Sequence, residues 1–85
     1  MSMSVDTDHG AYDALPTREQ DGAPAGAVLS VFCEDGARAG FVIPVEMESV
    51  YSLATNAAGE AIGTVSRTIA GAVDTVAAHD EGIKI

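Results

Sequence analysis

An alternation of apolar and polar side chains between residues 41 and 53 constrains the fold more than any other feature. The odd positions are apolar and the even ones largely polar: Phe41, Ile43, Val45, Met47, Tyr51 and Leu53 against Glu46, Glu48 and Ser52. A period of two is typical of a strand with one buried face and one solvated face. The pattern predicts one strand over 41–53 with its odd side chains buried. Met47→Asp should then strongly destabilise the domain, because it would bury an unpaired charge.

A second feature is the hairpin signal that precedes this strand. Residues 27–33 are rich in β-branched and aromatic types, and glycines 36 and 40 follow them. Asp35-Gly36 is a typical turn pair. Pro44 has no N–H and falls on the solvated parity, which indicates an edge strand or a bulge at that position.

Residues 54–78 allow two interpretations. A helical stripe of three- and four-residue spacing runs through Ile62, Val65, Ile69, Ala72 and Val76. Two glycines and many β-branched residues oppose a helix. We favour strands over 62–69 and 72–78, a turn over 79–82 and a closing strand over 83–85. The fold class expected is mainly β, a small open barrel or sandwich with an extended N-terminal arm. The alternative is an α+β fold with a β-hairpin and one C-terminal helix at about 58–78.

Residues 1–26 differ in composition from the rest of the chain. They are polar and acidic, carry two prolines and have few large apolar side chains. Such a segment buries too little apolar surface to offset the entropy of ordering. We therefore expect an extended arm over 1–26, ordered by a partner, and a small β-rich domain over 27–85. Tyr12, Leu15 and Pro16 are the expected partner-binding anchors, because apolar groups fill pockets at low entropic cost.

The net charge of -9 limits the classes of partner. Nucleic-acid binding and adhesion to anionic membranes both rest on clustered Lys and Arg, and the four basic residues here are scattered. The start of the chain carries no basic and apolar secretory signal, so secretion by that route is not expected. Cys33 is the single cysteine, which excludes an internal disulfide and favours a reducing compartment.

Few residues form a pattern that is typical of a catalytic or metal-binding site. His9 with its neighbouring aspartates, and Cys33 with His79, could be imagined as a metal site and a thiol–imidazole pair. A solvated polar arm and a buried core thiol explain them more simply. Glu46 and Glu48 share one strand face and fit a solvated surface. The sequence therefore predicts no catalytic residue, no cofactor and no metal, and a protein that is not an enzyme.

The order of features from Gly26 onward resembles a known family. A short β segment is followed by Gly36-Ala-Arg-Ala-Gly40, then by Glu48-Ser-Val-Tyr-Ser-Leu53, the Ala/Gly segment 54–59 and Ala61-Ile-Gly-Thr-Val65, and a short terminal strand is expected to close the chain. This order is similar to that of the small head-decoration, or cement, proteins of tailed bacteriophages. The resemblance implies a compact β-rich domain with an extended arm that binds the outer capsid lattice.

Two functions are therefore expected as alternatives. The first is a structural accessory protein of a virion, whose partners are a capsid lattice and copies of itself. The second is a small acidic inhibitor or adaptor in the cytoplasm that blocks a basic, nucleic-acid-binding surface. The acidic residues do not form a run in the sequence, which favours the first.

Overall fold

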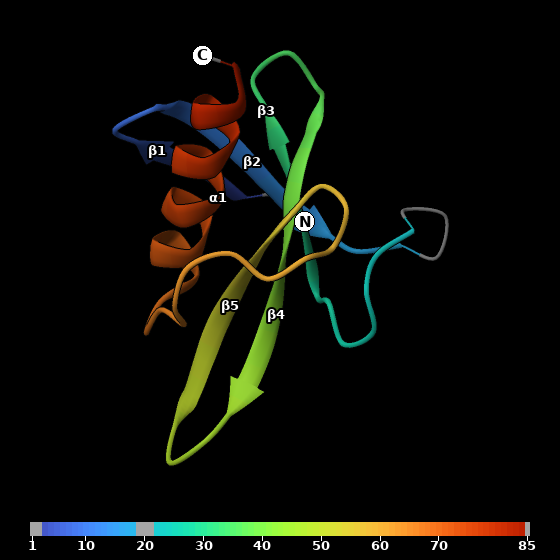
Figure 1. Cartoon of the computed structure of the whole chain (residues 1–85), viewed down its shortest axis with the longest axis vertical. Helices are drawn as coiled ribbons and strands as arrows, with labels where there is room; N and C mark the ends of the chain where they lie inside the picture. Colours follow the sequence, from blue (N-terminus) through green and yellow to red (C-terminus); the bar gives the residue numbers. More distant parts are fainter. Residues whose placement is uncertain (1–2, 19–21, 85) are drawn as a thin grey trace.

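The fold is mainly β, a curled half-barrel of five antiparallel strands with one C-terminal helix (Figure 1). The computed structural model describes residues 3–18 and 22–84, apart from the side chains of 83 and 84. Each strand pairs with its neighbours in chain order. The elements are β1 (Met3–Thr7), β2 (Gly10–Pro16), β3 (Leu29–Cys33), β4 (Arg38–Glu46), β5 (Val50–Asn56) and α1 (Ile69–Lys84).

The N-terminal segment belongs to the sheet, so the expected arm over 1–26 is wrong for residues 3–16. β1 and β2 form a hairpin with the register Val5↔Tyr12, and β2 continues into the sheet through Tyr12↔Cys33. The polar composition is that of alternating strands, since Asp13 points away from the core while Tyr12 and Ala14 are buried. Counting large apolar side chains missed this because one face of the hairpin is polar and Ala14 is small. Residues 1–2 and 19–21 of the expected arm lie outside the described residues.

The predicted strand over 41–53 is two strands, β4 and β5, joined by a turn at 47–49. The register Val45↔Tyr51 pairs odd residues with odd residues, so the alternation continues across the turn. A period of two therefore could not reveal the turn. Met47, expected to be buried, is 69 % exposed. The helix-facing side chains of this hairpin are the even ones, among them the buried Val42 and Ala54.

Pro44 lies where β4 has lost its neighbour on one side. β3 pairs with β4 only as far as Leu29↔Val42, and beyond this point β4 and β5 continue as a two-stranded ribbon. The missing N–H of the proline therefore costs no ladder hydrogen bond to β3, which agrees with the edge position that the sequence indicated.

The helical interpretation of the C-terminal segment is the correct one, with shifted bounds. Residues 69–84 form α1, so the strand over 72–78, the turn over 79–82 and the closing strand over 83–84 are wrong, and Ile85 lies outside the described residues. The Thr68 hydroxyl accepts a hydrogen bond from the Gly71 N–H at 3.0 Å, which caps the helix N-terminus. Residues 61 and 66 make only isolated bridges to β5.

The main core lies between α1 and one face of the sheet. The helix packs against all five strands, and its buried face includes Ala72, Val73, Val76 and Ala77. Small side chains on both layers allow a close approach: a Cβ on Gly40 would lie 2.0 Å from the Thr55 carbonyl oxygen and 3.0 Å from Val76 Cγ1. We call this side of the sheet the helix face and the other side the open face. In the part of the chain that is described, no helix is long and apolar enough to cross a membrane.

Candidate functional site

The open face of the sheet carries a hollow. Asp13 and Leu15 of β2 point to this face, and their register partners Phe32 and Ser30 of β3 point to it as well. Two segments, around Pro24 and around Gly59, contact each other, and a Cβ on Gly26 would touch Ile43. Phe41 and Thr55 on this face are only 1 % exposed. The region over β2 and β3 is left open.

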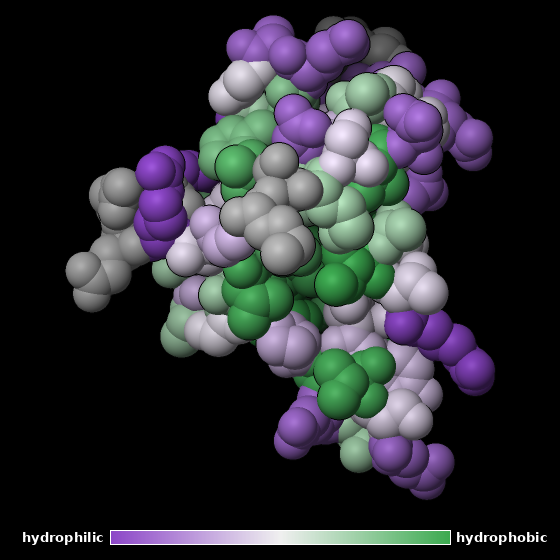
Figure 2. Space-filling model, turned by 180° about the vertical axis from the view of Figure 1, so that it is seen from behind, coloured by the Kyte–Doolittle hydropathy of each residue, from purple (hydrophilic) through white to green (hydrophobic). Residues whose placement is uncertain are grey.

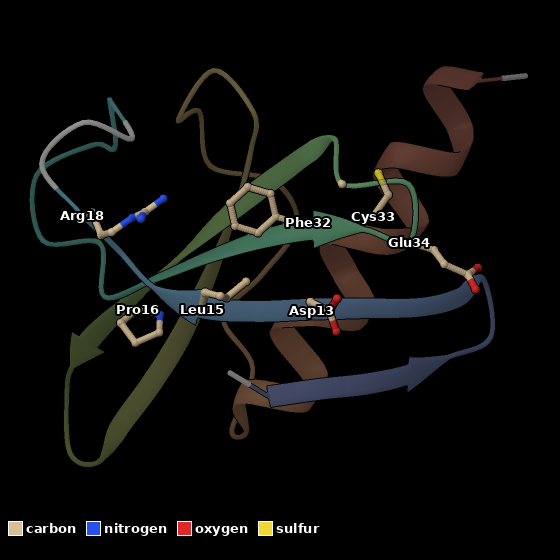
Figure 3. Close-up of a pocket in the computed structure, with 8 residues that line it drawn as sticks. Asp13, Leu15, Pro16, Arg18, Phe32, Cys33 and Glu34 are labelled. Atoms are coloured by element: carbon tan, nitrogen blue, oxygen red, sulfur yellow. The ribbon is translucent and has the colours of Figure 1, made fainter. Parts of the chain in front are cut away.

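The open-face hollow has a volume of about 580 Å³ and is lined by Asp13, Leu15, Pro16, Arg18, Phe32, Cys33, Glu34 and Gly36. Its middle is apolar: Figure 3 shows the Leu15 side chain and the Phe32 ring between Arg18 at one end and the carboxylates of Asp13 and Glu34 towards the other. Leu15, which lines the hollow, is 37 % exposed. A volume of this size is typical of a binding site.

A β-bulge and two rings support the inner wall of the hollow. The register of β3 with β4 shifts between Val31↔Gly40 and Phe32↔Arg38, so that Ala39 is the extra residue of β4. The Arg38 guanidinium carbon lies 5.7 Å from the Phe32 ring centroid and 5.4 Å from the Phe41 ring centroid. This distance fits a cation–π contact, which holds the Phe32 ring in place.

The fold collects acidic residues that are scattered in the sequence. The β1–β2 turn, the β3–β4 turn and the C-terminal half of α1 meet at one end of the sheet (Figure 1). Seven of the eleven acidic residues that the structure describes lie at or near this end: Asp6, Asp8, Asp13, Glu34, Asp35, Asp80 and Glu81. Figure 2, which views the molecule from behind, shows hydrophilic residues at the top, towards this end, and hydrophobic residues along the middle. We call it the acidic end.

Polar contacts at the acidic end fasten α1 to the sheet. The Tyr12 hydroxyl donates to the Asp80 carboxylate at 3.0 Å, and the Cys33 thiol lies 3.5 Å from the same oxygen. His9 pairs with Glu81. A smaller hollow of about 210 Å³ adjoins these residues. Cys33 is buried, as the sequence predicted, and its contact is with the Asp80 carboxylate. Within the described ranges no group of His, Cys, Asp and Glu could hold a metal ion.

The three predicted anchors lie in different environments in the structure. Leu15 and Pro16 line the open-face hollow. Tyr12 is only 5 % exposed and belongs to the core, so it is not available as an anchor. It points to the helix face because its strand position differs in parity from that of Leu15. Sequence reasoning missed Phe32, whose parity is opposite to that of the buried Val31 and Cys33. This difference in parity was the one signal in the sequence that Phe32 points to the other face of the sheet.

The comparisons with known proteins add no relative. No family model, no curated protein and no solved structure matches this chain.

Proposed function

We propose that this protein is a non-catalytic accessory component that binds a larger protein assembly through its open face. The observation that carries the proposal is the open-face hollow, in which Leu15 and Pro16 stand exposed beside Phe32. Exposed apolar groups around a rigid ring, on a sheet backed by a helix, are typical of a surface that another protein covers. The resemblance of the chain from Gly26 onward to phage head-decoration proteins makes a capsid lattice the assembly that we propose, with further copies of this chain beside it.

The small size of the chain supports a dependence on partners. A chain of 85 residues leaves a large share of its surface exposed, and a thin core of alanines and valines adds little burial per residue. Contact with an assembly would bury the open face and add buried apolar area on the side of the sheet opposite to that core. Fixed strands on both sides of the hollow keep the entropic cost of such binding low.

Co-sedimentation tests this proposal. The purified chain is mixed with empty shells assembled from the major capsid protein encoded nearest to its gene, and the bound fraction is measured with the wild type, Leu15→Asp and Val50→Asp. Val50 is 61 % exposed at the tip of the β4–β5 ribbon, so both variants place one charge on an exposed apolar site. We expect Leu15→Asp alone to lose binding. Equal binding by Leu15→Asp and the wild type, or no binding by the wild type, would overturn the proposal.

The acidic end favours one second candidate, an acidic inhibitor or adaptor that covers a basic, nucleic-acid-binding surface. Carboxylates gathered at one end create a local negative potential that the sequence did not indicate. The two candidates differ in their salt dependence. Binding through the acidic end should weaken steeply between low and high salt, whereas binding through the apolar hollow should weaken only modestly. Size-exclusion chromatography with a basic nuclease at two salt concentrations separates them.

A further inference from the structure

We infer that the open-face hollow accepts an extended protein segment in which a large apolar side chain and a Lys or Arg stand two residues apart. This inference rests on the proposed function, since it names the chemistry of the partner segment at the same site. The geometry comes from β2. Leu15 and Asp13 are two residues apart on one strand, so their side chains leave the same face about 7 Å from each other.

The charged residues around the hollow determine the orientation of the bound partner segment. Asp13 of β2 and Glu34 of the β3–β4 turn are both exposed, and they lie to one side of the apolar middle (Figure 3). Arg18 lies at the other end. A cationic side chain is therefore attracted at the Asp13 and Glu34 side. A segment that lies along β2 meets Leu15 and Phe32 with its apolar side chain when its cation reaches the two carboxylates.

The spacing distinguishes this inference from general attraction between a basic peptide and an acidic protein. Side chains two residues apart in an extended segment point to the same side, whereas adjacent ones point to opposite sides. A peptide with apolar and basic residues next to each other can place only one of them in the hollow. Composition and net charge being equal, only the spaced peptide fits both parts of the site.

Titration of the full-length, nitrogen-15-labelled chain with three blocked peptides tests the inference. The first contains Phe-Ser-Lys, the second has the same composition with Phe and Lys adjacent, and the third contains Phe-Ser-Glu. We expect the first to shift the backbone amide signals of Leu15, Phe32 and Glu34, and to bind about two- to fivefold more tightly than the others, the range for a solvent-screened charge contact. The double variant Asp13→Asn, Glu34→Gln should remove this preference, and Glu60→Gln, Asp74→Asn, which changes two exposed acids elsewhere, should keep it.

Three outcomes would overturn the inference. They are equal affinity for the spaced and adjacent peptides, equal affinity for the Lys and Glu peptides, and the absence of shifts at the hollow with all three. None of these would by itself remove the proposed function, because the capsid co-sedimentation with Leu15→Asp measures that function separately. The amide spectrum of each variant also reports whether it is folded.

Discussion

The Tyr12 hydroxyl donates a hydrogen bond of 3.0 Å to the carboxylate of Asp80, across sixty-eight positions of the chain. Tyr12 stands on β2, within the segment whose composition suggested an arm, and Asp80 stands on the last turns of α1. The contact therefore ties the beginning of the fold to its end. The Cys33 thiol adds a second, weaker contact to the same oxygen.

The first prediction concerns this contact. Asp80→Ala should destabilise the protein by about 1–3 kcal/mol relative to Asp74→Ala, because it leaves the Tyr12 hydroxyl without its acceptor at a buried site. Asp74 is an exposed carboxylate on the same helix, so both substitutions bring the same gain in intrinsic helix propensity. Urea unfolding followed by circular dichroism measures both. Equal midpoints for the two variants would show that the contact contributes nothing.

A second prediction concerns the close approach at Gly40. The Cβ of Gly40→Ala would lie 2.0 Å from the Thr55 carbonyl oxygen, and the β4–β5 pairing would have to move. We expect a loss of about 3 kcal/mol or more, at the upper end for overpacking. Gly82→Ala is the control, since a Cβ there meets no atom within 4 Å and should stabilise α1 by up to about 1 kcal/mol. Thermal unfolding that ranks Gly40→Ala above Gly82→Ala would contradict the packing described here.

The third prediction tests the start of α1. Thr68→Ala should cost about 1 kcal/mol, because the Gly71 N–H loses its hydrogen-bond acceptor, whereas Thr68→Ser should keep most of the stability. Thr64→Ala, at an exposed position of the preceding loop, should change little. Chemical denaturation of the three variants is the measurement. If Thr68→Ser is as unstable as Thr68→Ala, the hydroxyl is not the cap.

A fourth prediction reverses the expectation from the alternating pattern. Met47→Asp should change the free energy of unfolding by no more than about 0.5 kcal/mol, because Met47 is 69 % exposed in a turn. Val76→Asp should prevent folding, since Val76 is fully buried against the sheet and its charge would have no partner there. Soluble yield and urea midpoints distinguish the two. A severe effect of Met47→Asp would restore the single-strand interpretation of 41–53.

The sequence predicted those elements in which local chemistry agrees with the tertiary fold. β3 and its turn at Asp35-Gly36 have strand formers followed by a glycine with φ of 90°, and no distant contact is needed to recognise them. Periodicity alone failed at the turn after Val45, because a hairpin whose paired residues share parity preserves the alternation. The β-branched residues of α1 favoured strands, but the Thr68 cap and a small-residue face against Gly40 decide for a helix. Propensity is a weak guide when packing opposes it.

Only part of the candidate site could be predicted from the sequence, for a different reason. Leu15 and Pro16 stood out as isolated apolar residues in a polar segment, whereas the Phe32 ring belongs to a strand that reads as uniformly buried. Alternate side chains of this strand point to the two faces of the sheet, and the second face exists only once the sheet is assembled. The acidic end is likewise invisible in the chain, since Asp6, Glu34 and Asp80 come together only through the strand register and the packing of α1.

The last prediction concerns the acidic end. Carboxylates near one another repel, and mobile ions screen this repulsion over about 10 Å at 0.1 M salt. The free energy of unfolding should therefore rise between low salt and about 0.5 M sodium chloride, where screening is stronger. The double variant Asp6→Asn, Glu34→Gln should be more stable than the wild type at low salt and should respond less to added salt. Glu48→Gln, Glu60→Gln removes the same charge from exposed positions away from the acidic end and should have a smaller effect. Urea unfolding of the wild type and both double variants is measured at two salt concentrations. Equal salt responses of the two double variants, both weaker than that of the wild type, would mean that the net charge of -9, and not its concentration at one end of the sheet, sets the salt dependence of the stability.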